Sequence, residues 1–301
     1  MEHPIIVEGV SKHFGAQKAL QDISFEVKPA ELFGLIGPDG AGKSTLFRIL
    51  TTLLLADKGR AVVAGMDVVK QYKAIRRHVG YMPGRFSLYQ DLSVEENLHF
   101  FATIFNTTIT ANYDLIKDIY EQIQPFKDRP AGKLSGGMKQ KLALCCALVH
   151  KPVVLFLDEP TTGVDPVSRK EFWEMLKGLR EKGIPVLVST PYMDEAVLCD
   201  RVALIQDGSI LEIDTPQHII NRFRQPIWAA AADNMFRLLT SIRAFPQTAS
   251  CYAFGDSLHV TLQHGEADLP SLKAYLDGQQ QPYTIKPITA SIEDCFMALS
   301  A

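Results

Sequence analysis

The strongest indication of the fold of this chain is the segment Gly37-Pro38-Asp39-Gly40-Ala41-Gly42-Lys43-Ser44-Thr45. It matches the phosphate-binding loop pattern G-x-x-x-x-G-K-[ST] at every defined position. Residues 31–36 before it predict a short buried strand, and residues 44–50 after it predict the first turns of a helix. Because the pattern is meaningful where it joins a strand to a helix, we interpret it as a nucleotide site rather than a glycine-rich turn that happens to precede a lysine.

The residue types of this loop indicate its chemistry. Glycines let backbone N–H groups converge on phosphate oxygens, and the N-terminus of the following helix adds a positive dipole end. Lys43 is expected to reach the β- and γ-phosphates, and the Ser44 hydroxyl is expected to ligate Mg²⁺. All nine residues of 37–45 are therefore predicted to contribute to nucleotide binding.

Composition limits the class of protein. The chain has 301 residues, of which 47% are hydrophobic and 22% are charged, and its net charge of −3 gives no sign of a nucleic-acid partner. It has no run of 18 or more apolar residues and no signal-peptide pattern at its start, so we expect no membrane span and no secretion. The cysteines lack metal-ligand spacing and predict reduced thiols in the cytosol: Cys145, Cys146, Cys199, Cys251 and Cys295.

Strand-like and helix-like patterns alternate through the first three quarters of the chain. Short apolar runs predict strands at 5–7, 23–27, 61–64, 153–157 and 185–189. Helical spacing predicts helices at 93–105, 111–124, 136–149 and 166–182. A capping-box sequence at 93–96 is expected to begin the first of these helices. The alternation predicts a mostly parallel α/β sheet.

The pattern changes after about residue 224, where Gln225-Pro226 is typical of a linker. The remaining residues predict, in order, strand 227–232, helix 233–243, strands near 250–254 and 257–263, helix 268–278, strand 282–288 and helix 291–299. This βαββαβ order with an added helix predicts a ferredoxin-like domain over 225–301 after a nucleotide-binding domain over 1–224. We interpret His259 and His264, which lie near Asp256, as surface and turn residues rather than as a metal site.

A second motif places two carboxylates at the end of a predicted strand. Five consecutive apolar residues, 153–157, precede Asp158 and Glu159. Ligands of open α/β sheets bind at the carboxyl edge, where both side chains are expected. Asp158 is therefore predicted to hold Mg²⁺, and Glu159 to orient or deprotonate the attacking water. The alternative is that both residues cap the following loop.

A third segment, 134–140, begins a predicted helix with Ser135, Gly136 and Gly137. A glycine pair at a helix N-terminus is a phosphate-binding geometry. Taken alone, the same residues are also typical of an ordinary N-cap and turn.

In combination, these segments resemble the nucleotide-binding subunit of ATP-binding-cassette (ABC) transporters over about residues 4–222. The matching motifs are Walker A at 37–45, the signature at 134–140, Walker B at 153–158 and the D-loop at 163–165. Glu159 matches the catalytic carboxylate of that family. Phe14 matches the aromatic residue that stacks on adenine, with a core phenylalanine as the alternative. Segment 287–296 resembles the end of multidrug- and lipid-type exporter ATPases.

The resemblance implies the P-loop fold of ABC ATPases, with a mostly parallel core sheet, an antiparallel β subdomain and a helical subdomain. It implies that two such subunits pair head to tail around two ATP molecules, so that residues 135–137 contact the γ-phosphate bound by the other subunit. ATP with Mg²⁺ would close the dimer, and hydrolysis that depends on Lys43, Asp158 and Glu159 would reopen it.

The same resemblance implies an ATPase of a drug, lipid or polysaccharide exporter. Such a subunit is cytoplasmic and is held at the inner face of the membrane by membrane-spanning permease subunits. Residues 86–92 fall where the family forms the groove for a helix of the permease, with local packing onto the helical subdomain as the alternative.

Two positions depart from the family pattern. Gly84 stands where the family has a glutamine, and Pro191 stands where it has the switch histidine. Proline offers neither a side-chain donor nor a backbone N–H. Both changes predict slow hydrolysis with retained ATP binding, since the loss of one positioned polar group costs about 10²–10³ in rate.

These departures keep a second interpretation open, a regulatory ATP-binding half of a heterodimer that hydrolyses nothing. An ABC ATPase that acts on DNA or ribosomes is a third. Only about ninety residues separate Walker A from the signature, without a heptad run, and the charge is near neutral, so the third is disfavoured.

Overall fold

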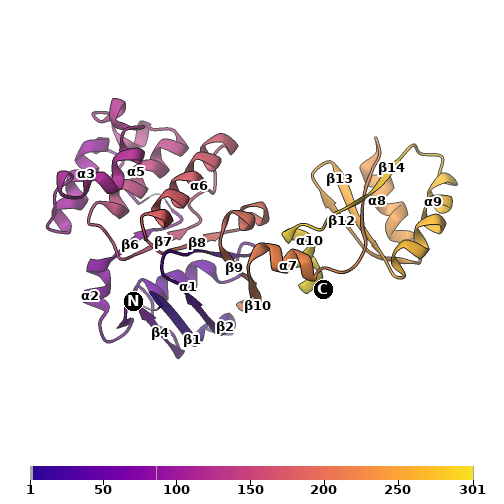
Figure 1. The fold of residues 1–301 in the computed structure, drawn as a ribbon, viewed down its shortest axis with the longest axis horizontal. Coiled ribbons are helices and arrows are strands. Elements are labelled where there is room, and N and C mark those ends of the chain that lie inside the picture. Colours follow the sequence, from indigo (N-terminus) through magenta and orange to yellow (C-terminus); the bar gives the residue numbers. More distant parts are fainter. Residues whose placement is uncertain (1–2, 86, 301) are drawn as a thin grey trace. The chain divides into compact units, whose positions relative to one another are not determined.

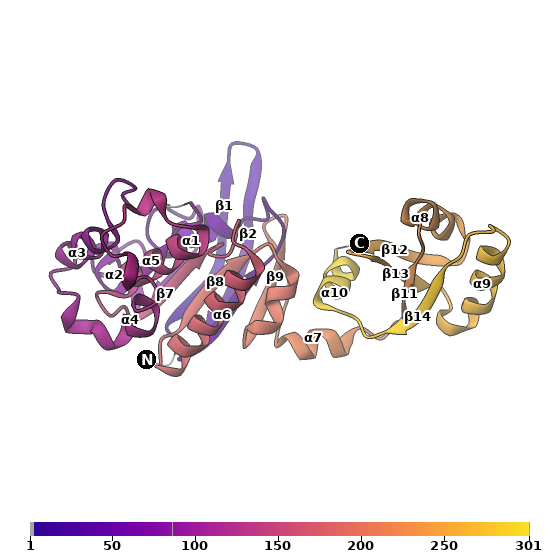
Figure 2. The ribbon, with the colours of Figure 1, turned by 90° about the horizontal axis from the view of Figure 1, so that it is seen from above.

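The computed structural model describes residues 3–85 and 87–300, shown from two directions in Figures 1 and 2. The chain divides into two compact units, one that ends at Pro216 and one that begins at Gln217. Within the described residues, the helices are too short or too polar to cross a membrane.

A six-stranded sheet forms the centre of the first unit, in the order β10-β9-β3-β8-β7-β6. Its strands are β3 Leu32–Ile36, β6 Val79–Met82, β7 Val154–Asp158, β8 Val186–Thr190, β9 Arg201–Gln206 and β10 Ser209–Asp214. The pairs from β9 to β6 are parallel, and β10 is an antiparallel edge strand. Every residue of β3, β7 and β8 is buried, as expected for strands covered on both faces. The carboxyl ends of these three strands therefore meet at one edge.

A separate antiparallel sheet has the order β2-β1-β4-β5. Its strands are β1 Ile5–Phe14, β2 Gln17–Val27, β4 Lys58–Val63 and β5 Met66–Asp67. β1 and β2 extend beyond the predicted runs 5–7 and 23–27, because a tight turn at Gly15 (φ 59°) joins them directly. Helix α1 (Lys43–Leu50) shares one apolar core with β1, β2, β4, β3 and β7. It therefore links the two sheets.

The remaining long helices of the first unit are α2 Tyr72–His78, α3 Val94–Ile104, α4 Tyr113–Tyr120, α5 Gly136–Leu148 and α6 Pro166–Glu181. Both α3 and α4 pack on α5, on the side of the central sheet away from β1 and β2 (Figure 1). The predicted capping box is confirmed, since Ser93 Oγ accepts from the Glu96 N–H while Glu96 accepts from the Ser93 N–H.

The helix predicted over 111–124 was too long. α4 ends at Tyr120, and short 3-10 turns stand on either side, η1 Thr110–Asn112 and η2 Gln124–Phe126. Pro125 lies in the second turn and has no backbone N–H to continue the α-helical hydrogen bonds. Two more 3-10 segments follow later in the unit, η3 Ala131–Lys133 and η4 Met193–Leu198.

The second unit contains an antiparallel sheet in the order β12-β13-β11-β14. Its elements are α7 Pro216–Arg222, β11 Ile227–Ala231, α8 Met235–Ala244, β12 Thr248–Phe254, β13 Ser257–Leu262, η5 Gly265–Asp268, α9 Leu269–Asp277, β14 Thr284–Ile288 and α10 Ile292–Leu299. The strand and helix order is the ferredoxin-like one that the sequence predicts.

Helix α7 explains where the contact boundary falls. The sequence prediction divided the chain after residue 224, whereas the compact second unit begins at Gln217. The Cys295 thiol on α10 donates to the Ile219 carbonyl on α7, 3.7 Å away, so most of α7 packs with the C-terminal elements. The linker-like Gln225-Pro226 therefore lies inside the second unit.

The two faces of the C-terminal sheet have different coverings. Leu258 and Val260 on β13 share an apolar core with α8 and α9. His259 between them points to the other face, since side chains alternate along a strand. There its Nδ1 is 2.7 Å from Asp294 on α10, which lies across the sheet from α9 (Figure 2). His259 is thus half-buried and paired with Asp294, not the plain surface residue predicted.

Candidate functional site

The loop between β3 and α1 closes tightly because of its glycines. A Cβ on Gly37 would lie 2.1 Å from the Ile205 carbonyl oxygen, and one on Gly42 would lie 2.4 Å from the Ala19 carbonyl oxygen. Gly42 also has φ 101° at the N-terminus of α1. Side chains are excluded at both positions, so the backbone itself can approach its neighbours, and a bound phosphate, closely.

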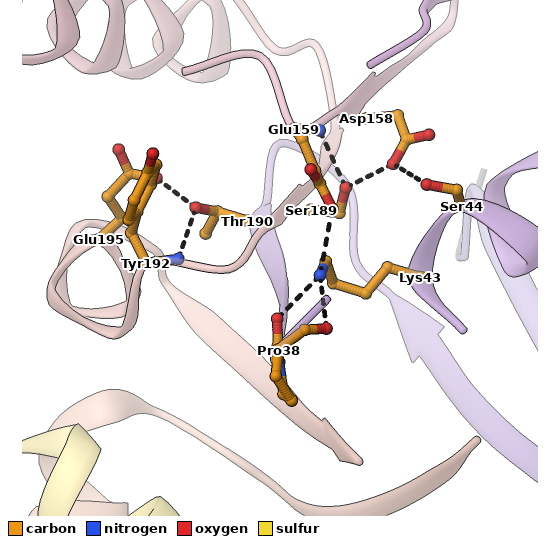
Figure 3. A network of polar contacts seen from close by, with 10 residues as sticks. Pro38, Lys43, Ser44, Asp158, Glu159, Ser189, Thr190, Tyr192 and Glu195 are labelled. Carbon is orange, nitrogen blue, oxygen red and sulfur yellow. Dashed lines mark hydrogen bonds and ion pairs between the residues drawn. The ribbon is translucent and has the colours of Figure 1, made fainter. Parts of the chain in front are cut away.

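Lys43 points back into this loop. Its buried Nζ donates to the Gly37 carbonyl at 2.8 Å and to the Pro38 carbonyl at 2.9 Å, and it lies 3.1 Å from Glu159 Oε1 (Figure 3). The lysine predicted to reach phosphates therefore lies within reach of the carboxylate predicted to activate water. The two predicted motifs form one site.

Asp158 at the end of β7 gathers two hydroxyl donors. Ser44 Oγ donates to Asp158 Oδ1 at 3.1 Å, and Ser189 Oγ donates to the same oxygen at 2.8 Å. Ser44 comes from α1 and Ser189 from β8, so three elements meet at a single buried carboxylate (Figure 3). Ser189 was not predicted from the sequence.

The oxygen atoms at Asp158 and Ser44 are suitable ligands for a magnesium ion. Mg²⁺ prefers hard oxygen ligands, commonly one or two carboxylates together with phosphate and water. The Ser44 hydroxyl and the Asp158 carboxylate supply such oxygens next to the phosphate-binding loop. The residues present are therefore compatible with the predicted ion.

Glu159 follows β7 in an unusual backbone conformation. Its φ of 50° lies in the left-handed region, which side chains of its kind seldom adopt. Its N–H is shared between the Ser189 carbonyl at 3.1 Å and Ser189 Oγ at 3.0 Å. Such a conformation persists only where the surroundings hold it, and it is common at functional sites. The backbone turns sharply here, and the carboxylate reaches Lys43.

The pKa of Tyr81, a tyrosine on β6, is affected by the negative charge at this edge of the sheet. Burial raises the pKa of Tyr81 to about 12, and the negative charge of Asp158 adds to that effect, while Arg48 opposes it. The phenol therefore stays neutral at all physiological pH values beside the Asp158 carboxylate.

The signature residues lie at the N-terminus of α5, apart from the loop 37–45. Ser135 caps α5 by accepting from the Met138 N–H at 3.3 Å, and both Ser135 and Gly136 are exposed. A Cβ on Gly137 would lie 2.5 Å from Ser168 Oγ on α6, so a glycine is required where the two helices meet. Within residues 3–85 and 87–300, the hydrogen bonds and ion pairs described join residues 135–137 to no residue of the phosphate loop.

Phe14 ends β1 with 49% of its surface exposed. Its ring lies 5.7 Å from Lys12 Nζ. The alternative interpretation as a core phenylalanine is therefore wrong. Stacking on adenine stays a prediction.

The two departures from the family pattern stand beside the carboxylates. A Cβ on Gly84 would lie 3.0 Å from the Asp158 carbonyl oxygen, so the loop after β6 approaches β7 more closely than a side chain would comfortably allow.

Pro191 follows Thr190, whose hydroxyl accepts from the Tyr192 N–H at 3.1 Å and donates to Glu195 at 2.5 Å (Figure 3). Sequence reasoning missed Thr190 and Glu195, because an acidic residue in such a helix-like segment is usually a solvated one.

A pocket of about 180 Å³ opens beside the segment after β6. It is lined by mostly apolar side chains, among them Met82, Pro83, Leu88, Phe101, Phe105 and Ala147. The Asn97 amide shapes the adjoining loop by donating to the carbonyls of Tyr89 and Leu92.

His150 stacks on Phe105 with ring centres 3.7 Å apart, and burial lowers the pKa of His150 to about 4. The pocket wall is therefore uncharged there near neutral pH.

Comparison with known proteins places this geometry in a family. A family model described as ABC transporter matches residues 20–162. The probable multidrug ABC transporter ATP-binding protein YbhF of Escherichia coli (strain K12) is 42% identical over 72% of this chain, a match that spans 38% of YbhF. The doxorubicin resistance ATP-binding protein DrrA of Mycobacterium tuberculosis is 38% identical over 72% of this chain and 67% of DrrA.

Some relatives match along nearly the whole length of this chain. The Nod factor export ATP-binding protein I of Burkholderia lata is 33% identical over 99% of this chain and 97% of its own. Among solved structures, an ATP-binding subunit of an ABC transporter is 26% identical with a TM-score of 0.66, covering 73% of this chain and 92% of that one. These cassettes confirm the predicted fold class. The chain belongs to the ABC transporter ATP-binding proteins, a family of ATPases in which ATP hydrolysis is characteristically coupled to transport.

Proposed function

We propose that this ABC ATPase powers an exporter by binding and hydrolysing ATP. The observation that carries the proposal is the convergence of Lys43, Ser44, Asp158 and Glu159 at the carboxyl edge of the central sheet. Binding groups and a general base within one cluster support phosphoryl transfer to water. The relatives are named for multidrug, drug-resistance and Nod factor export, which supports export as the process that is driven.

Each side chain has a separate role in this proposal. Lys43 exchanges the carbonyls of Gly37 and Pro38 for phosphate oxygens when ATP enters, since a lysine ammonium binds phosphate as a compact charge. Glu159 then loses its ion pair with Lys43 and accepts a proton from the attacking water. Ser44 and Asp158 would hold Mg²⁺, which neutralises charge on the phosphates when bound. Phe14 stacks on the adenine through its exposed ring.

The signature supports a head-to-tail dimer. Ser135 and Gly136 are exposed at the N-terminus of α5, where N–H groups and the helix dipole favour an anion. They are not joined to the phosphate loop of their own chain by the contacts described for it. We therefore propose that they contact the γ-phosphate on a second ABC ATPase subunit, and that ATP closes this dimer while hydrolysis reopens it.

Hydrolysis is proposed to be slow. Gly84 supplies no side chain beside Asp158, and Pro191 supplies no donor at the end of β8. A missing positioned donor costs about 10²–10³ in rate at such a site. A second candidate follows from the same observation, a regulatory ATP-binding half whose partner subunit does the hydrolysis.

The apolar pocket supports a membrane partner. Its lining residues include members of β6 and the loop after it, of α2, of α3 and of α5, so it opens between the sheet and the helical part of the first unit. We propose that a cytoplasmic helix of a membrane-spanning permease occupies it, which would hold the chain on the inner face of the cell membrane.

Steady-state ATP hydrolysis of the purified chain tests the proposal, with ATP affinity measured in parallel. Turnover that is abolished in Glu159→Gln, while ATP affinity is kept, supports a working ATPase. Tight ATP binding without turnover, both alone and with permease subunits in membranes, would favour the regulatory half. Absence of ATP binding would overturn both candidates.

A further inference from the structure

Glu195 is a buried carboxylate beside the site that none of the motifs assigns. It lies on η4 with 2% of its surface exposed. Its Oε2 accepts from Thr190 Oγ1 at 2.5 Å and from Thr161 Oγ1 at 3.0 Å, and its Oε1 accepts from Arg169 Nε at 3.1 Å. A buried charge is stable only when it is paired and hydrogen-bonded in this way. Three separate segments therefore converge on one side chain.

The two threonines connect Glu195 to both sides of the reaction site. Thr161 lies two residues after Glu159, in a turn where the Thr162 N–H donates to the Glu159 carbonyl and the Val164 N–H donates to the Thr161 carbonyl. Thr190 ends β8, and its carbonyl accepts from the Gly37 N–H at 3.3 Å. One carboxylate oxygen thus joins the turn that carries Glu159 to the strand end that contacts the phosphate loop.

The turn after β7 needs such a support. Glu159 adopts φ 50°, a conformation that the surrounding contacts must maintain. Ser189 holds the Glu159 N–H from one side. On the other side of the turn, Thr161 Oγ1 donates to Glu195 on η4. The direction of the Glu159 carboxylate therefore depends on both anchors.

We propose that Glu195 is a positioning residue for ATP hydrolysis in this chain. It fixes the turn that carries Glu159 and the end of β8 relative to each other, at the point where Pro191 supplies no imidazole. The inference rests on the proposed hydrolysis for its kinetic part, and on the hydrogen-bond network for its structural part. A misplacement of about an ångström at a reacting group can lower a rate about 10²-fold. A residue that holds the turn of Glu159 in place can therefore affect the rate without touching the substrate.

The testing variant is Glu195→Gln in the full-length chain. The amide keeps the shape of the side chain but offers one acceptor oxygen in place of two. Arg169 keeps its other partner, Asp194 Oδ2 at 3.2 Å, so no buried cation is left unpaired. Asp194→Asn is the matched control, because Asp194 contacts the same arginine through a side chain that is 74% exposed.

Four quantities are measured for each variant: kcat, KM, the Kd for ATP, and hydrogen exchange of the amides of Glu159, Thr162, Val164 and Tyr192. For Glu195→Gln we expect kcat to fall about 10- to 100-fold. We expect KM and Kd within about twofold of the wild type, and exchange of those four amides at least about tenfold faster. Asp194→Asn is expected to match the wild type throughout.

Three results would overturn the inference. The first is Glu195→Gln with wild-type kcat and wild-type exchange. The second is an equal loss in Asp194→Asn. The third is a loss of ATP affinity in step with kcat, with faster exchange across the whole first unit, which indicates general destabilisation. If Glu195→Gln does not fold, Thr161→Val removes a single donor and must reproduce the local exchange effect at Glu159 and Val164.

Failure of the proposed function has a different signature. A wild-type chain that binds ATP but shows no turnover contradicts hydrolysis by this chain. The exchange comparison still decides whether Glu195 holds the turn, since it needs no turnover. Unchanged exchange then overturns the positioning role, and faster exchange confined to the four amides supports it.

Discussion

The phosphate loop and the end of β8 face the same site but are built differently. The loop is made of backbone, closed by glycines that approach neighbouring carbonyls too closely for any side chain, and completed by Lys43. The end of β8 acts through side chains: Ser189 donates to Asp158 on β7, and Thr190 donates to Glu195 on η4. The loop matches its pattern at every defined position, whereas the strand end carries Pro191. Binding and turnover therefore depend on separate structures, and one can change while the other is kept.

The greatest loss of turnover is expected at Glu159, which follows β7 and whose N–H is held by Ser189 of β8. Glu159→Gln should lower kcat by about 10²–10⁴, because a positioned general base contributes about that factor. ATP affinity should stay the same or rise, since Lys43 loses its ion pair with Glu159 and is freer to meet phosphate. Steady-state hydrolysis and equilibrium ATP binding measure the two quantities. A kcat within tenfold of the wild type would mean that another group activates the water.

The second-largest effect is a loss of ATP affinity when Lys43 of the phosphate loop is replaced. Lys43→Ala should weaken ATP binding about 10- to 100-fold, because a hydrogen bond to a charged group is worth about 1.5–3 kcal/mol. Equilibrium titration with ATP checks this. Lys177→Ala is the control, since Lys177 forms a surface ion pair with Glu174 and should leave affinity unchanged. Equal affinity in both variants would contradict the role given to Lys43.

A gain of activity is expected when a donor is restored at position 191. Pro191→His should raise kcat about tenfold, below the full 10²–10³ of a pre-positioned donor, because the imidazole is introduced into a segment shaped around proline. ATP affinity should not change. Pro191→Ala removes the ring without adding a donor, and its kcat should stay at the wild-type value. An equal rise in both variants would mean that backbone freedom, not the imidazole, limits the rate.

The smallest effect is expected at Gly84. Gly84→Gln should change kcat by less than about threefold, because its Cβ would press on the Asp158 carbonyl oxygen at 3.0 Å and the loop has to move before the amide can help. Gly84→Ala measures the crowding alone. A large gain in Gly84→Gln would show that the loop adapts freely and that the missing amide limits turnover.

Periodicity and motifs predicted much of the fold. The buried runs at β7 and β8, the start of α3 at Ser93 and the order of the C-terminal elements were all found within a few residues of their predicted bounds. Local signals suffice there, because apolar runs, capping residues and turn glycines act over short distances. The β9–β10 hairpin was not assigned, and the helix predicted over 111–124 ends at Tyr120, before the 3-10 turn that contains Pro125.

The chemical groups of the site follow from the residues alone: the glycines of the loop, Lys43, Ser44, Asp158 and Glu159, and the absence of polar side chains at 84 and 191. Residue identity and short spacing are enough for that, since the loop and the strand ends are local structures. The tertiary structure alone decided that Ser189 links Asp158 to Glu159, that His259 pairs with Asp294, and that Glu195 is buried among Thr161, Thr190 and Arg169. Those contacts join residues far apart in the chain, and burial of a carboxylate depends on which distant donors surround it.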